Sequence, residues 1–275
     1  MRKKLLQTAA CAAISFAVCS PLAAQSRASD TAIKVSRSTV PLVRSSDLIF
    51  LGGAGAVFVG AMSADRSIQR SFQSKGTQGN SGLRHLSDAT GFYGDPGSVL
   101  ISAGLYFSGL GTHSRRLAAL GMHTGESVIF GGGLAEGIKG GVGRARPKFS
   151  PNDSRFFRSG KGYSNDDFAS FPSGETAAAF AASTALALGI NRDWPGHSRV
   201  VTPVAYTAAA LVGYSRLYKN AHWASDVVAG ATLGTASAVF VDRFNRRYTD
   251  NVFERWFLPT SLVPKRRGLA MAWSR

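Results

Sequence analysis

The apolar positions of this chain gather into segments that are rich in alanine and glycine. Six such segments stand out: 48–64, 98–111, 117–138, 177–190, 200–214 and 227–241. They show little of the apolar–polar alternation of a half-buried strand, so the pattern predicts helices. Stretches 74–97, 143–172 and 191–199 carry the Gly, Pro, Asn and Asp residues that mark turns. We therefore expect an all-α fold, a single bundle of about six helices.

The first residues of the chain predict export. A basic start at residues 2–4 precedes an apolar stretch that ends near Val18, and small residues around Ala24 follow. This order is typical of a secretory signal peptide and its cleavage site. We expect residues 1–24 to be a signal peptide, with an uncleaved membrane anchor as the alternative. Cys11 and Cys19 both lie in this segment, so we expect no disulfide and no cysteine metal site after cleavage.

The remaining chain divides by composition into three parts. Residues 25–46 are polar and are predicted to be flexible, residues 47–245 hold the six apolar segments and form one domain, and residues 246–275 form a basic tail. The formal charge of +16 favours an anionic partner, although a basic face solvated by water is the alternative. No nucleic-acid motif accompanies the basic residues, so we expect the tail to meet an anionic membrane surface and not nucleic acid.

The apolar segments fit a membrane span only in part. Most are shorter than the ~20 residues that a span requires, and segment 48–64 comes closest. Segment 117–138 contains His123, Glu126 and Glu136, whose transfer into lipid is costly. We therefore expect an exported, periplasmic bundle that is soluble or bound to the membrane surface.

Three clusters of polar residues carry the candidate chemistry. They read Lys139-Gly-Gly-Val-Gly-Arg-Ala-Arg146-Pro147, then Phe171-Pro172-Ser173-Gly174-Glu175-Thr176, then Ser215-Arg216 followed by His222 and Asp226. On a helix, His222 and Asp226 would share one face, where a carboxylate can fix one ring nitrogen and leave the other as a base or nucleophile. Arg216 supplies a planar fork suited to phosphate oxygens. Each cluster alone also has a purely structural explanation: cations at a helix C-terminus, Ser173 as an N-cap, and Asp226 near a helix N-terminus.

In this order, the motifs Lys-x6-Arg-Pro, Pro-Ser-Gly and Ser-Arg-x5-His-x3-Asp resemble those of the type 2 phosphatidic acid phosphatase superfamily. That superfamily also includes bacterial class A acid phosphatases and vanadium haloperoxidases. The resemblance spans roughly residues 95–245. It implies a helical bundle and a metal-independent phosphatase, without a cofactor, that hydrolyses phosphate monoesters or lipid (pyro)phosphates. The implied partner is a phosphorylated small molecule or a lipid phosphate.

The resemblance also implies a role for each matching residue. The groups that would hold the phosphate are Lys139, Arg146, Ser173, Gly174 and Arg216. His222 would attack phosphorus and form a phosphohistidine, and Asp226 would orient His222.

One position departs from the family pattern: Glu175 stands where the family usually has the histidine that protonates the leaving group. A carboxylic acid can do this only in its protonated form, so an ionised Glu175 would instead repel phosphate. A glutamate near a helix N-terminus is also favourable without any catalysis. Two alternatives therefore stay open: a catalytically impaired phosphate-binding relative, and a vanadate-dependent haloperoxidase that uses the same pocket.

Overall fold

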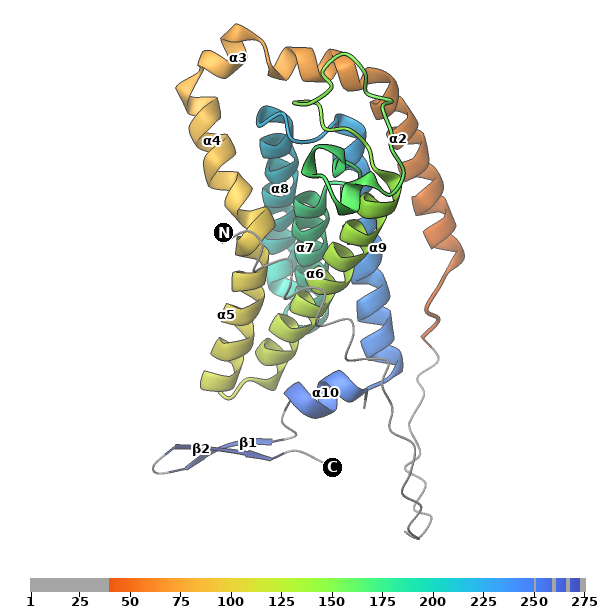
Figure 1. Cartoon of the computed structure of the whole chain (residues 1–275). Coiled ribbons are helices and arrows are strands. Elements are labelled where there is room, and N and C mark those ends of the chain that lie inside the picture. The colour runs from red at the N-terminus through yellow and green to blue at the C-terminus, as the bar shows by residue number, and fades with distance from the viewer. Residues whose placement is uncertain (1–39, 250, 259–260, 266–267, 273–275) are drawn as a thin grey trace. The chain divides into compact units, whose positions relative to one another are not determined.

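The computed structural model describes residues 40–249, 251–258, 261–265 and 268–272. The expected signal peptide, residues 1–24, and most of the expected flexible segment, residues 25–46, lie outside these residues. The long helices are α2 (Ser45–Phe72), α5 (Ser98–Gly111), α6 (Arg115–Val142), α7 (Gly174–Asp193), α8 (Pro195–Tyr218) and α9 (Ala224–Arg247). Each of them contains one of the six apolar segments, so the predicted helical bundle is confirmed (Figure 1).

Shorter elements occupy stretches in which composition predicted none. α3 (Lys75–Gly79), α4 (Ser81–Phe92) and the π-helical turn η1 (Tyr93–Gly97) lie between α2 and α5. Two 3-10 turns, η2 (Lys161–Tyr163) and η3 (Asp166–Phe168), lie between α6 and α7. The described part of the tail holds α10 (Val252–Phe257) and an antiparallel hairpin of β1 (Ser261–Lys265) and β2 (Gly268–Ala272), in which Ser261 pairs with Ala272.

Helix α6 ends at a turn that requires glycine. Gly143 follows the helix with a φ of 63°, the left-handed conformation that glycine adopts without strain. A Cβ at this position would lie 1.7 Å from the carbonyl oxygen of Arg158. Only glycine therefore fits here, and it starts the loop 143–173 that leads to α7.

Helix α7 is the centre of the bundle and packs against α6, α8 and α9. Its buried face is made of small side chains, among which Ala177, Ala179, Ala181 and Ala182 are fully buried. A Cβ at Gly230 of α9 would lie 2.4 Å from the carbonyl oxygen of Ser173, so α9 and the start of α7 are in direct backbone contact. Small residues thus set the close packing that brings the starts of these two helices together.

The outer faces of several helices carry exposed apolar side chains. Leu48, Ile49 and Val59 on α2 are 69%, 78% and 66% exposed, and Ile129 on α6 is 71% exposed. By length and composition, two of the described helices, α2 and α9, could cross a membrane. In α2, none of the 18-residue stretch that is apolar enough to span a membrane is buried. In α9, 44% of the corresponding stretch is buried. Helix α2 therefore turns its apolar residues outward, whereas α9 also serves the core.

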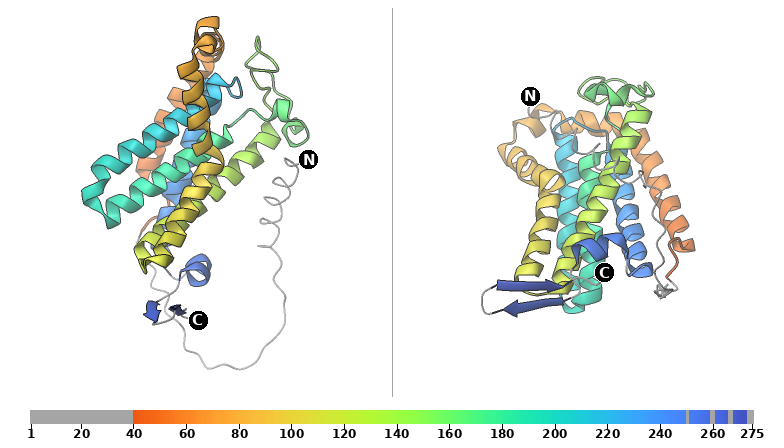
Figure 2. Two further views of the ribbon diagram at one scale, coloured as in Figure 1. Left: turned by 90° about the vertical axis from the view of Figure 1, so that its left-hand side faces the viewer. Right: turned by 60° about the horizontal axis from the view of Figure 1, so that its bottom comes forward.

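The sequence clusters meet at one end of the bundle. The loop 143–173, the start of α7, the end of α8 and the start of α9 lie together there (Figure 1). Helix α10 lies at the opposite end (Figure 2). There the Tyr106 hydroxyl of α5 donates a 2.7 Å hydrogen bond to the carbonyl of Phe257.

Candidate active site

The three clusters are presented by helix ends. Lys139 lies in the last turn of α6, Ser173 precedes the first residue of α7, and Arg216 lies in the last turn of α8. His222 lies in the turn before α9, which begins at Ala224. His222 therefore does not lie on one helix with Asp226, and the helical face that they would share does not form.

The imidazole of His222 is fully buried, and both of its nitrogens have partners. Nδ1 lies 2.7 Å from the carbonyl oxygen of Ser170, and Nε2 lies 3.2 Å from Oε2 of Glu175. The Ser170 carbonyl can only accept, so Nδ1 carries a hydrogen, and Nε2 faces the carboxylate of Glu175. Glu175 therefore covers Nε2, the ring nitrogen that does not face the Ser170 carbonyl.

The carboxylate of Glu175 bridges His222 and Arg216. Its Oε1 accepts a hydrogen bond from Nη1 of Arg216 at 3.1 Å, while its Oε2 faces His222. Burial raises the pKa of the Glu175 carboxyl group, but the hydrogen bond to His222 and the positive charges of His222, Lys139 and Arg216 outweigh burial. The net pKa is well below the usual range. An ionised carboxylate thus occupies the position between a histidine nitrogen and an arginine.

Lys139 and Gly174 lie against each other on the neighbouring side. Lys139 is 7% exposed, and its Nζ lies 2.5 Å from Oε1 of Glu136. A Cβ at Gly174 would lie 2.9 Å from this Nζ, so the missing side chain lets the ammonium group approach the start of α7. The first turn of a helix offers backbone N–H groups without intrahelical partners, which favours an anion there. The predicted phosphate contacts of Lys139 and Gly174 are therefore sterically compatible.

Arg146 points toward the turn that carries His222. Its Nε and Nη2 donate to the carbonyl oxygen and Oδ1 of Asp166 at 2.8 and 2.7 Å. Its Nη1 donates to the carbonyl oxygen of Ala221 at 3.3 Å. Arg146 is thus fixed beside the residue that precedes His222.

Ser173 acts as the N-cap of α7. Its hydroxyl is fully buried and accepts a hydrogen bond from the backbone N–H of Thr176 at 3.4 Å. The structural explanation of this serine is confirmed, and its contact with phosphate stays a prediction.

Asp226 does not bond to His222 as the spacing predicted. Its Oδ2 lies 4.0 Å from Nδ1 of His222, beyond hydrogen-bond distance. This oxygen instead accepts hydrogen bonds from the Ser170 hydroxyl at 2.5 Å and from the Trp223 N–H at 2.9 Å. Because the Ser170 carbonyl holds the ring of His222, Asp226 fixes the segment that orients the ring.

A buried network behind Asp226 was missed by the sequence analysis. Nη1 of Arg144 donates to Oδ1 of Asp226 at 2.6 Å, and Nη2 donates to Oδ2 of Asp65 at 2.7 Å. All three side chains are at most 1% exposed. Arg144 lies inside the first motif, and Asp65 directly follows the first apolar segment, which ends at Ala64. These two positions in the sequence are the signals that could have pointed to the network.

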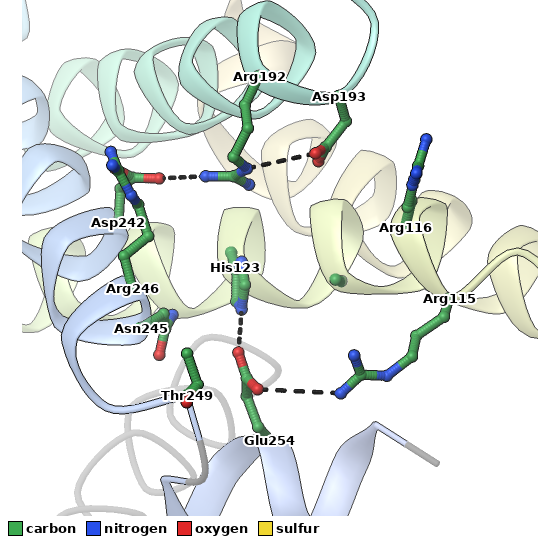
Figure 3. A pocket seen from close by; sticks show the side chains of 11 residues that line it. Arg115, Arg116, His123, Arg192, Asp193, Asp242, Asn245, Arg246, Thr249 and Glu254 are labelled. Atoms are coloured by element: carbon green, nitrogen blue, oxygen red, sulfur yellow. Dashed lines mark hydrogen bonds and ion pairs between the residues drawn. The ribbon is translucent and has the colours of Figure 1, made fainter. Parts of the chain in front are cut away.

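A cavity of about 450 Å³ lies away from this cluster, where the ends of α7 and α9 meet the start of α6 (Figure 3). Its lining contains none of the motif residues. Glu254 of α10 lies there 3.4 Å from Nε2 of His123 and 4.0 Å from Arg115. Within the part of the chain that the structure describes, no group of three or more His, Cys, Asp and Glu side chains is placed to hold a metal ion.

Several known proteins are similar to this chain. A lipid A 1-phosphatase of Porphyromonas gingivalis is 45% identical over 65 residues, which are 24% of this chain and 14% of that protein. A lipid A 1-phosphatase of Rhizobium johnstonii is 33% identical over 168 residues, 55% of this chain and 64% of that protein. Phosphatidylglycerophosphatase B of Bacillus subtilis is 28% identical over 73% of this chain and 93% of that protein. The chain thus spans less than two thirds of the lipid A 1-phosphatases that it matches.

One solved structure is also similar, the crystal structure of the first transmembrane PAP2 type phosphatidylglycerolphosphate phosphatase from Bacillus subtilis. The match covers 76% of this chain and 97% of that chain, with 23% identity and a TM-score of 0.49. The family model of the PAP2 superfamily matches residues 120–250. That segment contains all three motif clusters, from Lys139 to Asp226. Residues 120–250 of this chain therefore match the PAP2 superfamily, the family that its motifs resemble.

Proposed function

We propose that this chain is a metal-independent phosphatase that hydrolyses lipid phosphates through a phosphohistidine on His222. The observation that carries the proposal is the carboxylate of Glu175 in contact with both Nε2 of His222 and Nη1 of Arg216. A carboxylate and a phosphoryl group are both oxyanions that an arginine fork binds. The place that Glu175 occupies is therefore one that suits the phosphoryl group of a substrate.

The first step of the proposed reaction frees the nucleophile. The substrate phosphate displaces the carboxylate from Arg216, and the hydrogen on Nε2 of His222 passes to Glu175. Nε2 is left with a free electron pair, and Glu175 becomes a carboxylic acid. The negative charge of the substrate favours this transfer because it opposes a second anion nearby. Nδ1 keeps its hydrogen on the Ser170 carbonyl.

The second step transfers the phosphoryl group. The electron pair of Nε2 forms a bond to phosphorus as the bond from phosphorus to the leaving oxygen breaks, and Glu175 gives its proton to that oxygen. Arg216, Lys139 and Arg146 neutralise the charge on the remaining phosphoryl oxygens. A positioned acid of this kind contributes ~10²–10⁴-fold to the rate.

The third step releases phosphate. A water molecule attacks phosphorus and gives a proton to Glu175, and the P–N bond breaks with its electron pair returning to Nε2. Phosphate leaves, and the proton on Glu175 returns to Nε2 of His222. The contact between Nε2 of His222 and the carboxylate of Glu175 is thereby restored for the next turnover.

A lipid phosphate is the favoured substrate class. Helix α2 has the length and composition of a membrane span and exposes Leu48, Ile49 and Val59. Among the similar proteins are a lipid A 1-phosphatase and a phosphatidylglycerophosphatase B. An enzyme that contacts a membrane meets its lipid substrate at the surface where the headgroup lies. We propose an exported protein that associates with the membrane and acts at its periplasmic face.

The impaired phosphate-binding relative is the second candidate, and the same carboxylate supports it. If Glu175 never leaves His222 and Arg216, phosphate esters meet a filled site with a blocked nucleophile. Binding of phosphate without turnover is the expected behaviour of such a protein.

Release of inorganic phosphate tests the proposal. The full chain in detergent micelles is assayed with excess chelator against lipid phosphates, isoprenoid pyrophosphates and soluble esters. We expect turnover of at least one lipid phosphate, its inhibition by vanadate, and its loss in His222→Ala. His197→Ala, an exposed histidine at the start of α8, is the matched control and keeps activity. Activity that disappears with chelator and returns with a divalent metal contradicts the mechanism, and phosphate binding without turnover favours the second candidate.

A further inference from the structure

Helix α2, from its middle to its C-terminal end, contacts the segments that carry the site. The ring of Phe58 packs edge-on against Phe171 of the second cluster, with centroids 5.8 Å apart. Gln69 donates a 3.1 Å hydrogen bond to Asn220 in the turn before His222. Residues 45–72 lie outside the segment 120–250 that matches the family. Contacts from beyond the family segment therefore reach two of the three clusters.

The residue of α2 that is buried is Asp65, whose side chain is a carboxylate. Its Oδ2 accepts hydrogen bonds from Nη2 of Arg144 and from the Ser225 hydroxyl, both at 2.7 Å. Its Oδ1 accepts one from the Ser225 N–H at 2.9 Å. Arg144 in turn donates to Asp226 at 2.6 Å. Two buried carboxylates, one from α2 and one from α9, thus share a single guanidinium group.

The orientation of this guanidinium group is fixed on every side. Its Nε and Nη2 both donate to the carbonyl oxygen of Ser154, at 3.0 and 2.6 Å. Its Nη1 also donates to the Ser225 hydroxyl at 2.7 Å. Holding α2 in place does not require buried charges, because apolar residues of similar volume often serve stability as well or better. A fully bonded ionic network in this position therefore points to a geometric role.

We propose that Asp65 is a positioning residue for the reaction described above, and this inference rests on that proposed function. Asp65 fixes Arg144, Arg144 fixes Asp226, and Asp226 holds the segment that orients His222. The four contacts are Asp65 to Arg144 at 2.7 Å, Arg144 to Asp226 at 2.6 Å, Asp226 to the Ser170 hydroxyl at 2.5 Å, and the Ser170 carbonyl to Nδ1 of His222 at 2.7 Å. Helix α2 thereby completes a site whose other parts all lie within the family segment.

The test replaces the carboxylate with an amide of the same shape in the full chain. Asp65→Asn is assayed on the lipid phosphate that the wild type hydrolyses, and kcat is divided by the number of competent sites, counted from the burst of phosphoenzyme. We expect kcat per site to fall at least about tenfold while KM stays within about twofold, because a displaced nucleophile slows chemistry without removing the phosphate-binding cations.

Asp47→Asn is the matched control. Asp47 is an aspartate on the same helix and also pairs with an arginine, Arg243 of α9, at 2.5 and 2.9 Å. It lies near the start of α2, 18 residues before Asp65, and makes none of the contacts above. We expect both kcat per site and KM of this variant to match the wild type. Equal losses in Asp47→Asn and Asp65→Asn would overturn the inference, since the effect would then be one of helix docking.

Two further variants separate positioning from folding. In an Arg144→Gln background, Asp65→Asn is expected to cause no additional loss of kcat, because its effect passes through Arg144. Ser225→Ala keeps all three charges and is expected to lower kcat per site in the same direction by a smaller factor. Additive losses in the double variant, or an unchanged kcat per site in Asp65→Asn, overturn the proposal.

A readout that does not need turnover keeps the two proposals distinguishable. If the wild type hydrolyses no phosphate, the proposed function fails. The positioning role is then decided by the proton resonance of Nδ1–H of His222, which reports its bond to the Ser170 carbonyl. We expect Asp65→Asn to shift this resonance and Asp47→Asn to leave it in place. A resonance that is the same in all three proteins overturns the inference.

Discussion

Replacing Glu175 by glutamine keeps the shape of the side chain but removes its charge and its ability to carry a proton. In the structure the carboxylate contacts Nε2 of His222 at 3.2 Å and Nη1 of Arg216 at 3.1 Å. It is therefore both a competitor of phosphate and the candidate proton donor. We expect the substitution to tighten phosphate binding and to slow the chemical step, two effects that separate in KM and kcat.

The sizes of the two effects follow from the contacts. Charge-assisted hydrogen bonds stabilise by about 1.5–3 kcal/mol. The side chain of Glu175 is 27% exposed, so solvent screening reduces this energy. A remainder of ~1.4 kcal/mol corresponds to about tenfold tighter binding of inorganic phosphate. Loss of the proton donor lowers kcat by ~10²–10⁴-fold for alkyl esters and much less for aryl esters, whose leaving group needs little protonation.

The assay compares a lipid alkyl phosphate with an aryl phosphate over acid to neutral pH. The wild type should work best on the acid side of neutrality, because Glu175 must carry the proton that it gives to the leaving oxygen. Glu175→His should restore alkyl ester cleavage and move the optimum upward. Glu254→Gln is the control, since Glu254 also pairs with a histidine and an arginine, His123 and Arg115, but at the other end of the bundle (Figure 3).

The reasoning is refuted if Glu175→Gln and the wild type hydrolyse both ester classes equally at every pH. Glu175 would then be no general acid, and its place at the start of α7 would be explained by favourable interaction with the helix N-terminus. A tenfold weaker affinity of Glu175→Gln for phosphate, in place of a tighter one, would refute the competitor role alone.

Three further predictions concern the guanidinium group of Arg216, the loop that starts at Gly143, and the pH dependence of stability. Arg216→Lys keeps the charge but loses the planar fork, so kcat/KM should fall about 10–100-fold, and an unchanged kcat/KM would mean that a point charge suffices. Gly143→Ala places a Cβ 1.7 Å from the Arg158 carbonyl oxygen at a φ of 63°, so it should cost at least ~1–3 kcal/mol of unfolding free energy. Gly141→Ala, with nothing within 4 Å of its Cβ, is the control, and equal melting temperatures would contradict this. The lowered pKa of Glu175 in the folded protein means that its ionised form adds stability above the usual carboxyl pKa of ~4.3 and loses it as pH falls through the folded value. The Tm of the wild type should therefore exceed that of Glu175→Gln at neutral pH and approach it in acid, and a gap that widens in acid would contradict the assignment.

The six long helices could be predicted because each has an apolar run rich in small residues and bounded by turn residues. Their ends could not, because polar residues continue the helix once it packs. Helix α2 runs to Phe72, eight residues past the apolar segment that ended at 64. Helix α4 was missed for a related reason: its residues are mostly polar or small, and its start depends on the Asn80 side chain that caps it.

The cations and His222 could be predicted as one site because their motifs have fixed spacings. The supporting network could not, because its members are far apart in the chain. Asp65 and Arg144 are separated by 79 residues, and Arg144 and Asp226 by 82. A direct hydrogen bond between Asp226 and His222 is absent for a local reason: His222 stands in a turn, so the four-residue spacing does not set its distance from the carboxylate.

Trapping the covalent intermediate tests the central claim most directly. The full chain is mixed with a lipid phosphate labelled at phosphorus, in excess chelator, and quenched in base within the first turnover, because a phosphohistidine survives base and is lost in acid. We predict one labelled peptide, with the phosphoryl group on Nε2 of His222, and no label in His222→Ala. Turnover without a labelled histidine, or a label that persists in His222→Ala, would contradict the account.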